Sequence, residues 1–161
     1  MHILLATDAA WIVDEVTAAL GDDDVHFTVC REGRAVARQV VEQLPDLAIL
    51  DLQIGSMGGM AVTMSLRLDE SAGVVDHVPV LMLLDRQADM HLARRSGAEG
   101  WLVKPLDSLR LRRATDALLA GGVYTEGLAD DAPAVESMVP LPDGHVADAE
   151  NSSEEESATA R

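Results

Sequence analysis

The chain has 161 residues and a mass of 17.2 kDa, the size of one domain with an extension, which argues against a two-domain enzyme with a separate cofactor module. Its net charge of −16 is unfavourable for binding nucleic acid, because that affinity depends largely on neutralising phosphates with lysine and arginine. No apolar run approaches the roughly 20 residues of a membrane span, no secretory signal is recognisable, and the single cysteine fits a reducing compartment. We therefore expect a cytoplasmic protein that binds neither nucleic acid directly nor a membrane.

Short apolar runs and amphipathic runs alternate along residues 1–121. The apolar runs predict strands at residues 3–6, 25–30, 47–50, 78–84 and 100–103. After each run, apolar residues recur at helical spacing and predict helices at residues 12–20, 37–44, 60–68, 87–96 and 108–118. Strand–helix units of this kind predict an α/β fold, a doubly wound parallel sheet with helices on both faces.

Residues 122–161 differ from the rest of the chain in composition. They contain ten acidic residues against one basic residue, three prolines and almost no apolar periodicity. A segment of this composition cannot bury enough apolar surface to offset the entropy lost on ordering. We expect a folded domain over residues 1–121 and a disordered acidic tail over residues 122–161.

Charged residues follow several of the predicted strands. In an open parallel sheet, ligands bind beyond the carboxyl ends of the strands, where Asp8, Asp51, Leu84 and Lys104 are expected. Two neighbouring carboxylates suit Mg²⁺, and a carboxylate can also be the nucleophile in phosphoryl transfer if a cation balances the added charge. Lys104, the only lysine of the chain, is the candidate for that cation.

Three segments resemble the receiver domains of bacterial two-component response regulators. They are Pro-Asp-Leu-Ala-Ile-Leu-Asp-Leu at residues 45–52, Met-Gly-Gly at residues 57–59, and Gly-Ala-Glu-Gly-Trp-Leu-Val-Lys-Pro at residues 97–105. The resemblance covers about residues 1–121. It implies a flavodoxin-like (βα)5 sheet with strand order 2-1-3-4-5 and a cis peptide bond between Lys104 and Pro105.

The resemblance also implies roles for individual residues. Asp51 is implied as the phospho-acceptor, and Asp8, Asp51 and the backbone carbonyl of Gln53 as the groups that hold Mg²⁺. Lys104 is implied to contact the acyl phosphate. Trp101 occupies the position of an aromatic residue that, in this family, rotates between an exposed and a buried position.

Two positions depart from the family pattern. Receivers usually carry two consecutive acids after the first strand, whereas this chain has Thr7 followed by Asp8. They usually end the fourth strand with Thr or Ser, whereas this chain has Leu84. Leucine has no hydroxyl group that can follow a phosphoryl group, and its bulk should restrict Trp101 to one rotamer.

These observations leave three functional hypotheses. The preferred one is a single-domain, atypical response regulator that a histidine kinase or phosphotransfer protein phosphorylates on Asp51 and that acts on a protein effector by direct contact. The second is a pseudo-receiver that binds partners without phosphorylation. The third is a phosphatase with an aspartate nucleophile, against which Gln53 counts, because such enzymes have an acid at that position.

Several other residues are interpreted as structural. Trp11, three residues after Asp8, is expected to pack in the core or at a helix end, with a position that borders the crevice as the alternative. Met60 and Met64 at helical spacing are expected in the core. Arg94 and Arg95 are expected on a solvated surface, with a partner surface as the alternative.

Overall fold

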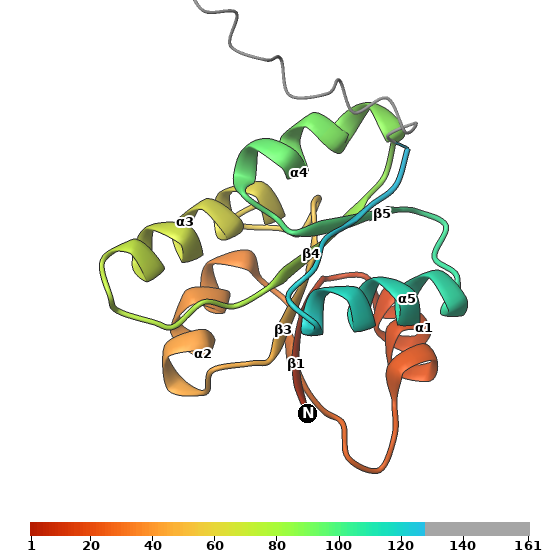
Figure 1. The fold of residues 1–161 in the computed structure, drawn as a ribbon, viewed down its shortest axis with the longest axis horizontal. Helices are drawn as coiled ribbons and strands as arrows, with labels where there is room; N and C mark the ends of the chain where they lie inside the picture. Colours follow the sequence, from red (N-terminus) through yellow and green to blue (C-terminus); the bar gives the residue numbers. More distant parts are fainter. Residues whose placement is uncertain (128–161) are drawn as a thin grey trace, which may run out of the picture. The chain divides into compact units, whose positions relative to one another are not determined.

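The computed structural model describes residues 1–127, which form a parallel sheet covered by helices on both faces (Figure 1). The sheet has six strands in the order β2-β1-β3-β4-β5-β6. The strands are β1 (His2–Ala6), β2 (His26–Cys30), β3 (Leu47–Asp51), β4 (Val80–Leu84), β5 (Gly100–Val103) and β6 (Tyr124–Thr125). The α-helices are α1 (Ala10–Leu20), α2 (Val36–Glu42), α3 (Gly59–Ser71), α4 (Met90–Ser96) and α5 (Ser108–Leu119).

The two faces of the sheet carry separate apolar clusters, because successive side chains of a strand point to opposite faces. The central strands β3 and β4 are buried along their whole length, which explains their uninterrupted apolar sequences. Under α1 and α5 lie Ile3, Leu5, Ile49, Leu81, Leu83 and Leu102. Under α2, α3 and α4 lie Leu4, Ala6, Leu50, Val80, Met82, Leu84 and Trp101.

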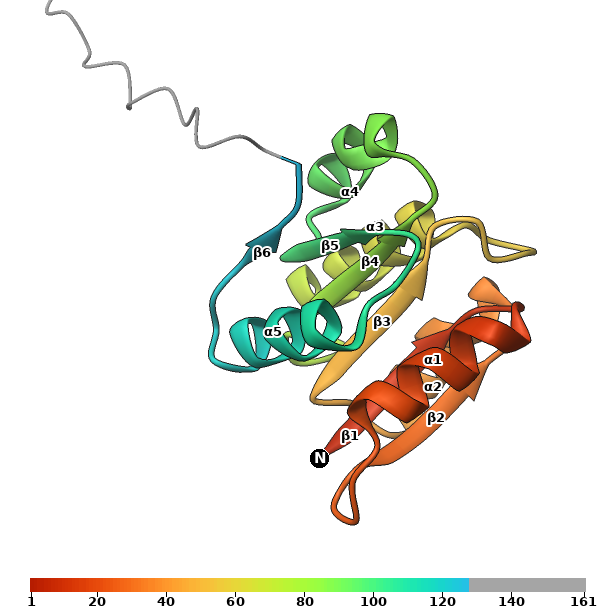
Figure 2. The same cartoon turned by 90° about the vertical axis from the view of Figure 1, so that its right-hand side faces the viewer.

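The structure confirms the predicted α/β fold and the strand order 2-1-3-4-5, and it adds one strand. β6 is parallel to β5 and forms the outer edge of the sheet (Figure 2). It belongs to the segment that the sequence analysis assigned to the tail, so the boundary at residue 122 is too early. The backbone groups at the open edge of β5 need partners, and β6 supplies them. The remainder of the predicted tail, residues 128–161, lies outside the described residues.

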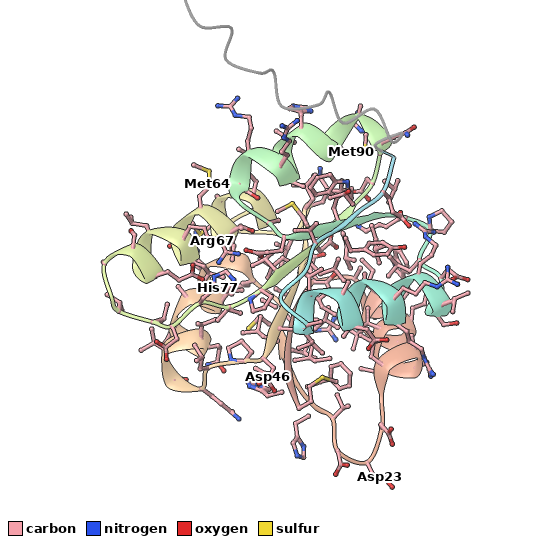
Figure 3. All side chains as sticks on the ribbon, viewed as in Figure 1. Asp23, Asp46, Met64, Arg67, His77 and Met90 are labelled. Atoms are coloured by element: carbon pink, nitrogen blue, oxygen red, sulfur yellow. The ribbon has the colours of Figure 1, made fainter. Side chains whose placement is uncertain are left out.

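The helices are shorter than a membrane span. The longest described helix, α3, has 13 residues, and no helix within residues 1–127 is long and apolar enough to cross a membrane. The prediction that Met64 belongs to the core is wrong, because this residue of α3 is 51% exposed (Figure 3). Met60, one turn earlier, is half-buried against the cluster that contains Trp101.

A cluster of charged side chains lies at the amino-terminal ends of β4 and β5. Arg67 of α3 donates to both carboxylate oxygens of Glu99, at 2.8 and 2.7 Å, and to Glu70 and the carbonyl of Val78. His77 lies beside the same two carboxylates, at 3.1 Å from Glu70 and 3.5 Å from Glu99 (Figure 3). These contacts tie α3 to the segments that lead into β4 and β5.

Candidate functional site

The carboxyl ends of β1, β3 and β5 bring Thr7, Asp51 and Lys104 together. Asp51 is the last residue of β3 and is 3% exposed. Lys104 Nζ lies 2.8 Å from Asp51 Oδ1, and the Thr7 hydroxyl donates to Asp51 Oδ2 at 2.9 Å. The backbone N–H of Gln53 donates to Oδ1 at 3.2 Å. These donors replace the water that the buried carboxylate has lost, so both of its oxygens are paired.

Lys104 is held from three sides. Besides Asp51, its ammonium contacts Asp85 Oδ1 at 3.1 Å, and it lies 5.9 Å from the centroid of the Trp11 ring. Its side chain is only 11% exposed. The ammonium therefore lies between two carboxylates and an aromatic face, a geometry that holds it against the Asp51 carboxylate.

Trp11 and Asp85 also lie at the site; sequence reasoning gave this position for Trp11 only as an alternative and missed the role of Asp85. Trp11 is 47% exposed and borders the site at the beginning of α1, so it does not pack in the core and the alternative position at the crevice is the one observed. Its position three residues after Asp8 was the signal for the crevice, although an apolar residue at the beginning of a helix is more often a packing residue. Asp85 directly follows β4, as Asp8 follows the first strand region, and this strand-end position is the signal that could have identified it.

Asp8 lies at the outer side of the site. It is exposed, and its Oδ2 accepts a hydrogen bond from the backbone N–H of Gly55 at 3.3 Å, in the loop that follows Asp51. Within residues 1–127 there is no group of three His, Cys, Asp or Glu side chains placed to hold a metal ion. Mg²⁺, however, is commonly held by one or two carboxylates with several waters, so the donor set of Asp8, Asp51 and the Gln53 carbonyl fits this ion in its chemistry.

Leu84 and Trp101 lie on the other face of the sheet from the Asp51 side chain, as the alternation along β3 and β4 requires. Leu84 is fully buried in one cluster with Leu52, Met82 and Trp101. Trp101 is 3% exposed, and its Nε1 donates to the carbonyl oxygen of Glu126 at 2.9 Å. The indole is thus in its inward position, fixed by a residue that follows β6.

Glu126 is a further residue that the sequence analysis missed. Besides its carbonyl, its carboxylate pairs with Arg110 of α5 and accepts the backbone N–H of Val103 at 3.0 Å. The preceding residues, Val123, Tyr124 and Thr125, are all types enriched in strands, and this was the available signal for order in the segment. The overall acidity of residues 122–161 concealed it.

Comparison with known proteins identifies the family. The family model for the response regulator receiver domain matches residues 3–116. Protein PilH of Pseudomonas aeruginosa is 30% identical over 123 residues, which cover 74% of this chain and 98% of PilH. The DNA-binding response regulator MtrA of Mycobacterium tuberculosis is 31% identical over 106 residues, which cover 65% of this chain and 44% of MtrA. The chain thus spans less than half the length of MtrA.

Solved structures show the same fold. A putative response regulator from Chloroflexus aurantiacus superposes with a TM-score of 0.67 at 20% identity, over 74% of this chain and 97% of the other. The chemotaxis response regulator CheY4 of Vibrio cholerae superposes with a TM-score of 0.63 at 23% identity, over 71% and 95%. Since the matched family model and the sheet order agree with the arrangement of Asp51 and Lys104 at the strand ends, the chain belongs to the response regulator receiver domain family.

Proposed function

We propose that this protein is an atypical response regulator that accepts a phosphoryl group on Asp51 and signals through protein contacts. The donor is a histidine kinase or a phosphotransfer protein, and the exchange takes place in the cytoplasm. The observation that carries the proposal is the contact of 2.8 Å between Lys104 Nζ and Asp51 Oδ1 at the carboxyl end of the parallel sheet. The DNA-binding activity in the name of MtrA is not carried over, because the matched region covers 44% of that protein.

The residues present can support phosphoryl transfer to a carboxylate. A carboxylate oxygen of Asp51 attacks the phosphorus atom of a phosphohistidine, the bond from phosphorus to nitrogen breaks, and the imidazole nitrogen keeps the electron pair. Lys104 then balances the charge of the aspartyl phosphate. Mg²⁺, held by Asp8, Asp51 and the Gln53 carbonyl, would supply further positive charge to the phosphoryl oxygens.

Thr7 and Asp85 define how this site departs from the family pattern. Thr7 supplies a hydroxyl that donates to Asp51, where a second carboxylate would instead add negative charge for the metal. Asp85 shares the ammonium of Lys104 with the acceptor carboxylate, at 3.1 against 2.8 Å. The neutral Thr7 weakens the attraction of the site for a cation, and Asp85 weakens its attraction for a phosphoryl group by competing for Lys104, so we expect slow phosphorylation.

A phosphorylation-independent interaction module is the second candidate. The neutral Thr7, the apolar Leu84 and the competing Asp85 are the observations that favour it. The phosphatase hypothesis has less support, because an amide side chain at Gln53 cannot act as a general acid.

Intact mass spectrometry after incubation with acetyl phosphate and Mg²⁺ separates these hypotheses. The proposed function predicts a mass increase of one phosphoryl group that is absent in Asp51→Ala. An Asp85→Asn variant should be labelled faster, because Lys104 then has one carboxylate partner. If the wild-type chain and Asp85→Asn both remain unlabelled under conditions that label a receiver with both acids, the interaction module is the correct function.

A further inference from the structure

The segment after α5 covers the outer edge of β5. Tyr124 pairs with Gly100 and Thr125 with Trp101 in parallel register, and the backbone N–H of Tyr124 donates to the carbonyl of Glu99 at 3.1 Å. Residues 122–127, here called the cover segment, thereby run along β5 between α4 and α5 (Figure 2). The edge of β5 would otherwise present unpaired backbone groups.

Two glycines allow this close approach. A Cβ atom at Gly100 would lie 2.8 Å from the carbonyl oxygen of Tyr124, closer than real side chains approach a backbone oxygen. Gly127 has a φ of 76°, which L-residues with side chains rarely adopt, and a Cβ atom there would meet Gln87 and Met90 at 2.8 Å. The cover segment is thus fitted to β5 at its beginning and to the start of α4 at its end.

Glu126 is the polar anchor of the cover segment. Its two carboxylate oxygens pair with Nε and Nη2 of Arg110, a bidentate geometry that recognises carboxylates strongly. Arg110 is itself oriented by the backbone carbonyls of Val103, at 2.8 Å, and Pro105, at 3.0 Å. A guanidinium held in this way is a preformed carboxylate receptor at the edge of a strand.

The cover segment leaves parts of this surface open. A groove of about 440 Å³ lies along Val103, Arg110 and Glu126, and an apolar hollow of about 290 Å³ lies between Trp101 and the start of α4. A longer peptide on the same edge would therefore find additional surface. The surface formed by Trp101, Val103, Arg110 and the start of α4 is here called the β5-edge surface.

We propose that the β5-edge surface is a docking site for an extended acidic segment of a partner protein, and that the cover segment is its intramolecular competitor. The partner adds a parallel strand to β5 and places one carboxylate on Arg110, as Glu126 does. The inference rests on the proposed function only in taking this partner to be the effector. It concerns the edge of the sheet at β5, which β4 separates from β3 and Asp51.

The short link between α5 and β6 favours the cover segment over a partner that binds from solution. Four residues separate α5 from β6, so the cover segment faces the β5 edge at an effective concentration that is roughly millimolar for short linkers. A partner that binds an open β5-edge surface at micromolar concentration is therefore excluded while the cover segment is in place. Release of the cover segment, and not a change of the surface itself, controls docking.

The test uses the full-length chain and a fluorescein-labelled peptide with the sequence of residues 121–128, followed by fluorescence anisotropy. Glu126→Ala weakens the competitor and leaves the docking surface intact. We expect this variant to bind the peptide roughly 10- to 100-fold more tightly than the wild-type chain, the range of a charged hydrogen-bonded pair. A peptide with Gln in place of its Glu should lose this gain.

Matched variants on α5 test the surface. Added to Glu126→Ala, Arg110→Ala should abolish peptide binding, whereas Arg113→Ala, an exposed arginine of the same helix, should not. Glu126→Gln, which preserves side-chain shape, replaces Glu126→Ala if circular dichroism shows that the latter is unfolded. Equal binding to the wild-type chain and the Glu126 variants, or binding that does not depend on the carboxylate of the peptide, would overturn the proposal.

The assay contains no phosphoryl donor and gives the same expected result in an Asp51→Ala background. Failure of Asp51 to become phosphorylated therefore leaves the peptide-binding result unchanged. Conversely, a chain that is phosphorylated but never binds the peptide retains the proposed function and loses this inference.

Discussion

Thr7 is the residue that most directly distinguishes this site from one with two acids. Its hydroxyl donates to Asp51 Oδ2 at 2.9 Å and accepts the backbone N–H of Ala9 at 3.2 Å, and the residue is fully buried. A hydroxyl at this position satisfies Asp51 in the absence of a metal ion. An acid would repel Asp51 unless a cation lay between them.

We predict that Thr7→Asp tightens Mg²⁺ binding and lowers the melting temperature of the metal-free protein. The added carboxylate supplies a metal ligand and, without metal, places a like charge against Asp51. Isothermal titration with Mg²⁺ and thermal melts with and without Mg²⁺ measure both effects, with Thr7→Val as the control that removes the hydroxyl alone. Unchanged Mg²⁺ affinity in Thr7→Asp would show that residue 7 does not contribute to metal binding.

The carboxyl group of Glu70 should make the free energy of unfolding depend on pH. Burial raises the pKa of its carboxyl group, but hydrogen bonds from the Val78 N–H and from His77, with the charge of Arg67, outweigh burial and lower the pKa below its usual 4.5. Because the folded-state pKa is depressed, the stabilisation is complete above pH 4.5 and is lost as the pH falls through the folded-state value.

Replacement of Glu70 by Gln should remove this dependence. We expect Glu70→Gln to lower the free energy of unfolding at neutral pH by about 1–3 kcal/mol, since charged hydrogen bonds are lost. The difference from the wild-type chain should shrink below pH 4.5, where the wild-type carboxylate also becomes protonated. Urea titrations at several pH values measure it, and Glu42→Gln on the exposed face of α2 is the control. A difference that stays constant with pH would contradict this assignment.

At the scale of elements, β4 and β5 form the unit that would transmit a change from the proposed phosphoryl site. Leu84 pairs with Val103 in the register of these strands, and the backbone N–H of Lys104 donates to the Leu84 carbonyl at 2.8 Å. The buried cluster of Leu84 and Trp101 is on the other face. A ligand at Asp51 can move Trp101 between two positions only if the ligand binds more tightly to the protein with Trp101 in one of them. Leu84 offers no polar group that could create such a difference in affinity.

We predict that Trp101 hardly responds to occupation of the proposed acceptor site at Asp51. In a Trp11→Phe background, beryllofluoride with Mg²⁺ should leave the emission of Trp101 nearly constant, because its indole is packed against Leu84 and bonded to the Glu126 carbonyl. Leu84→Thr in the same background should respond. Asp51→Ala serves as the control for binding of the mimic. A strong response with Leu84 present would show that the strand pair switches without a hydroxyl.

At the scale of the whole molecule, the sheet could be predicted because apolar runs determine which segments are buried on both faces. The ends of those runs then placed Asp51 and Lys104 in one crevice. β6 could not be predicted in this way, because it is two residues long and its stability comes from tertiary partners, Arg110 and Gly100, that are distant in sequence. The exposed positions of Trp11 and Met64 likewise depend on helix orientation, which helical periodicity alone does not fix.

The position of β6 changes the expectation for truncated chains. Composition alone predicts that a chain ending after Gly122 keeps its melting temperature. That chain, however, lacks β6 and Glu126, the carboxylate partner of Arg110. We now expect truncation after Gly122 to lower the free energy of unfolding by about 1–3 kcal/mol, whereas truncation after Gly127 should leave it nearly unchanged. Thermal and urea denaturation of both chains measure this. Equal stability of the two chains would show that β6 contributes nothing to the fold.

The pairing of Lys104 with two carboxylates should slow its reaction with amine-directed reagents. Amine-directed acylating reagents attack the neutral amine, and the chain offers them only its amino terminus and Lys104. Because the ε-amino group is paired with Asp51 and Asp85, its acylation rate reports how often it leaves both carboxylates. The acylation rate of Lys104 in the unmodified protein is thus a measure of how open the crevice is, and no other lysine contributes to the signal.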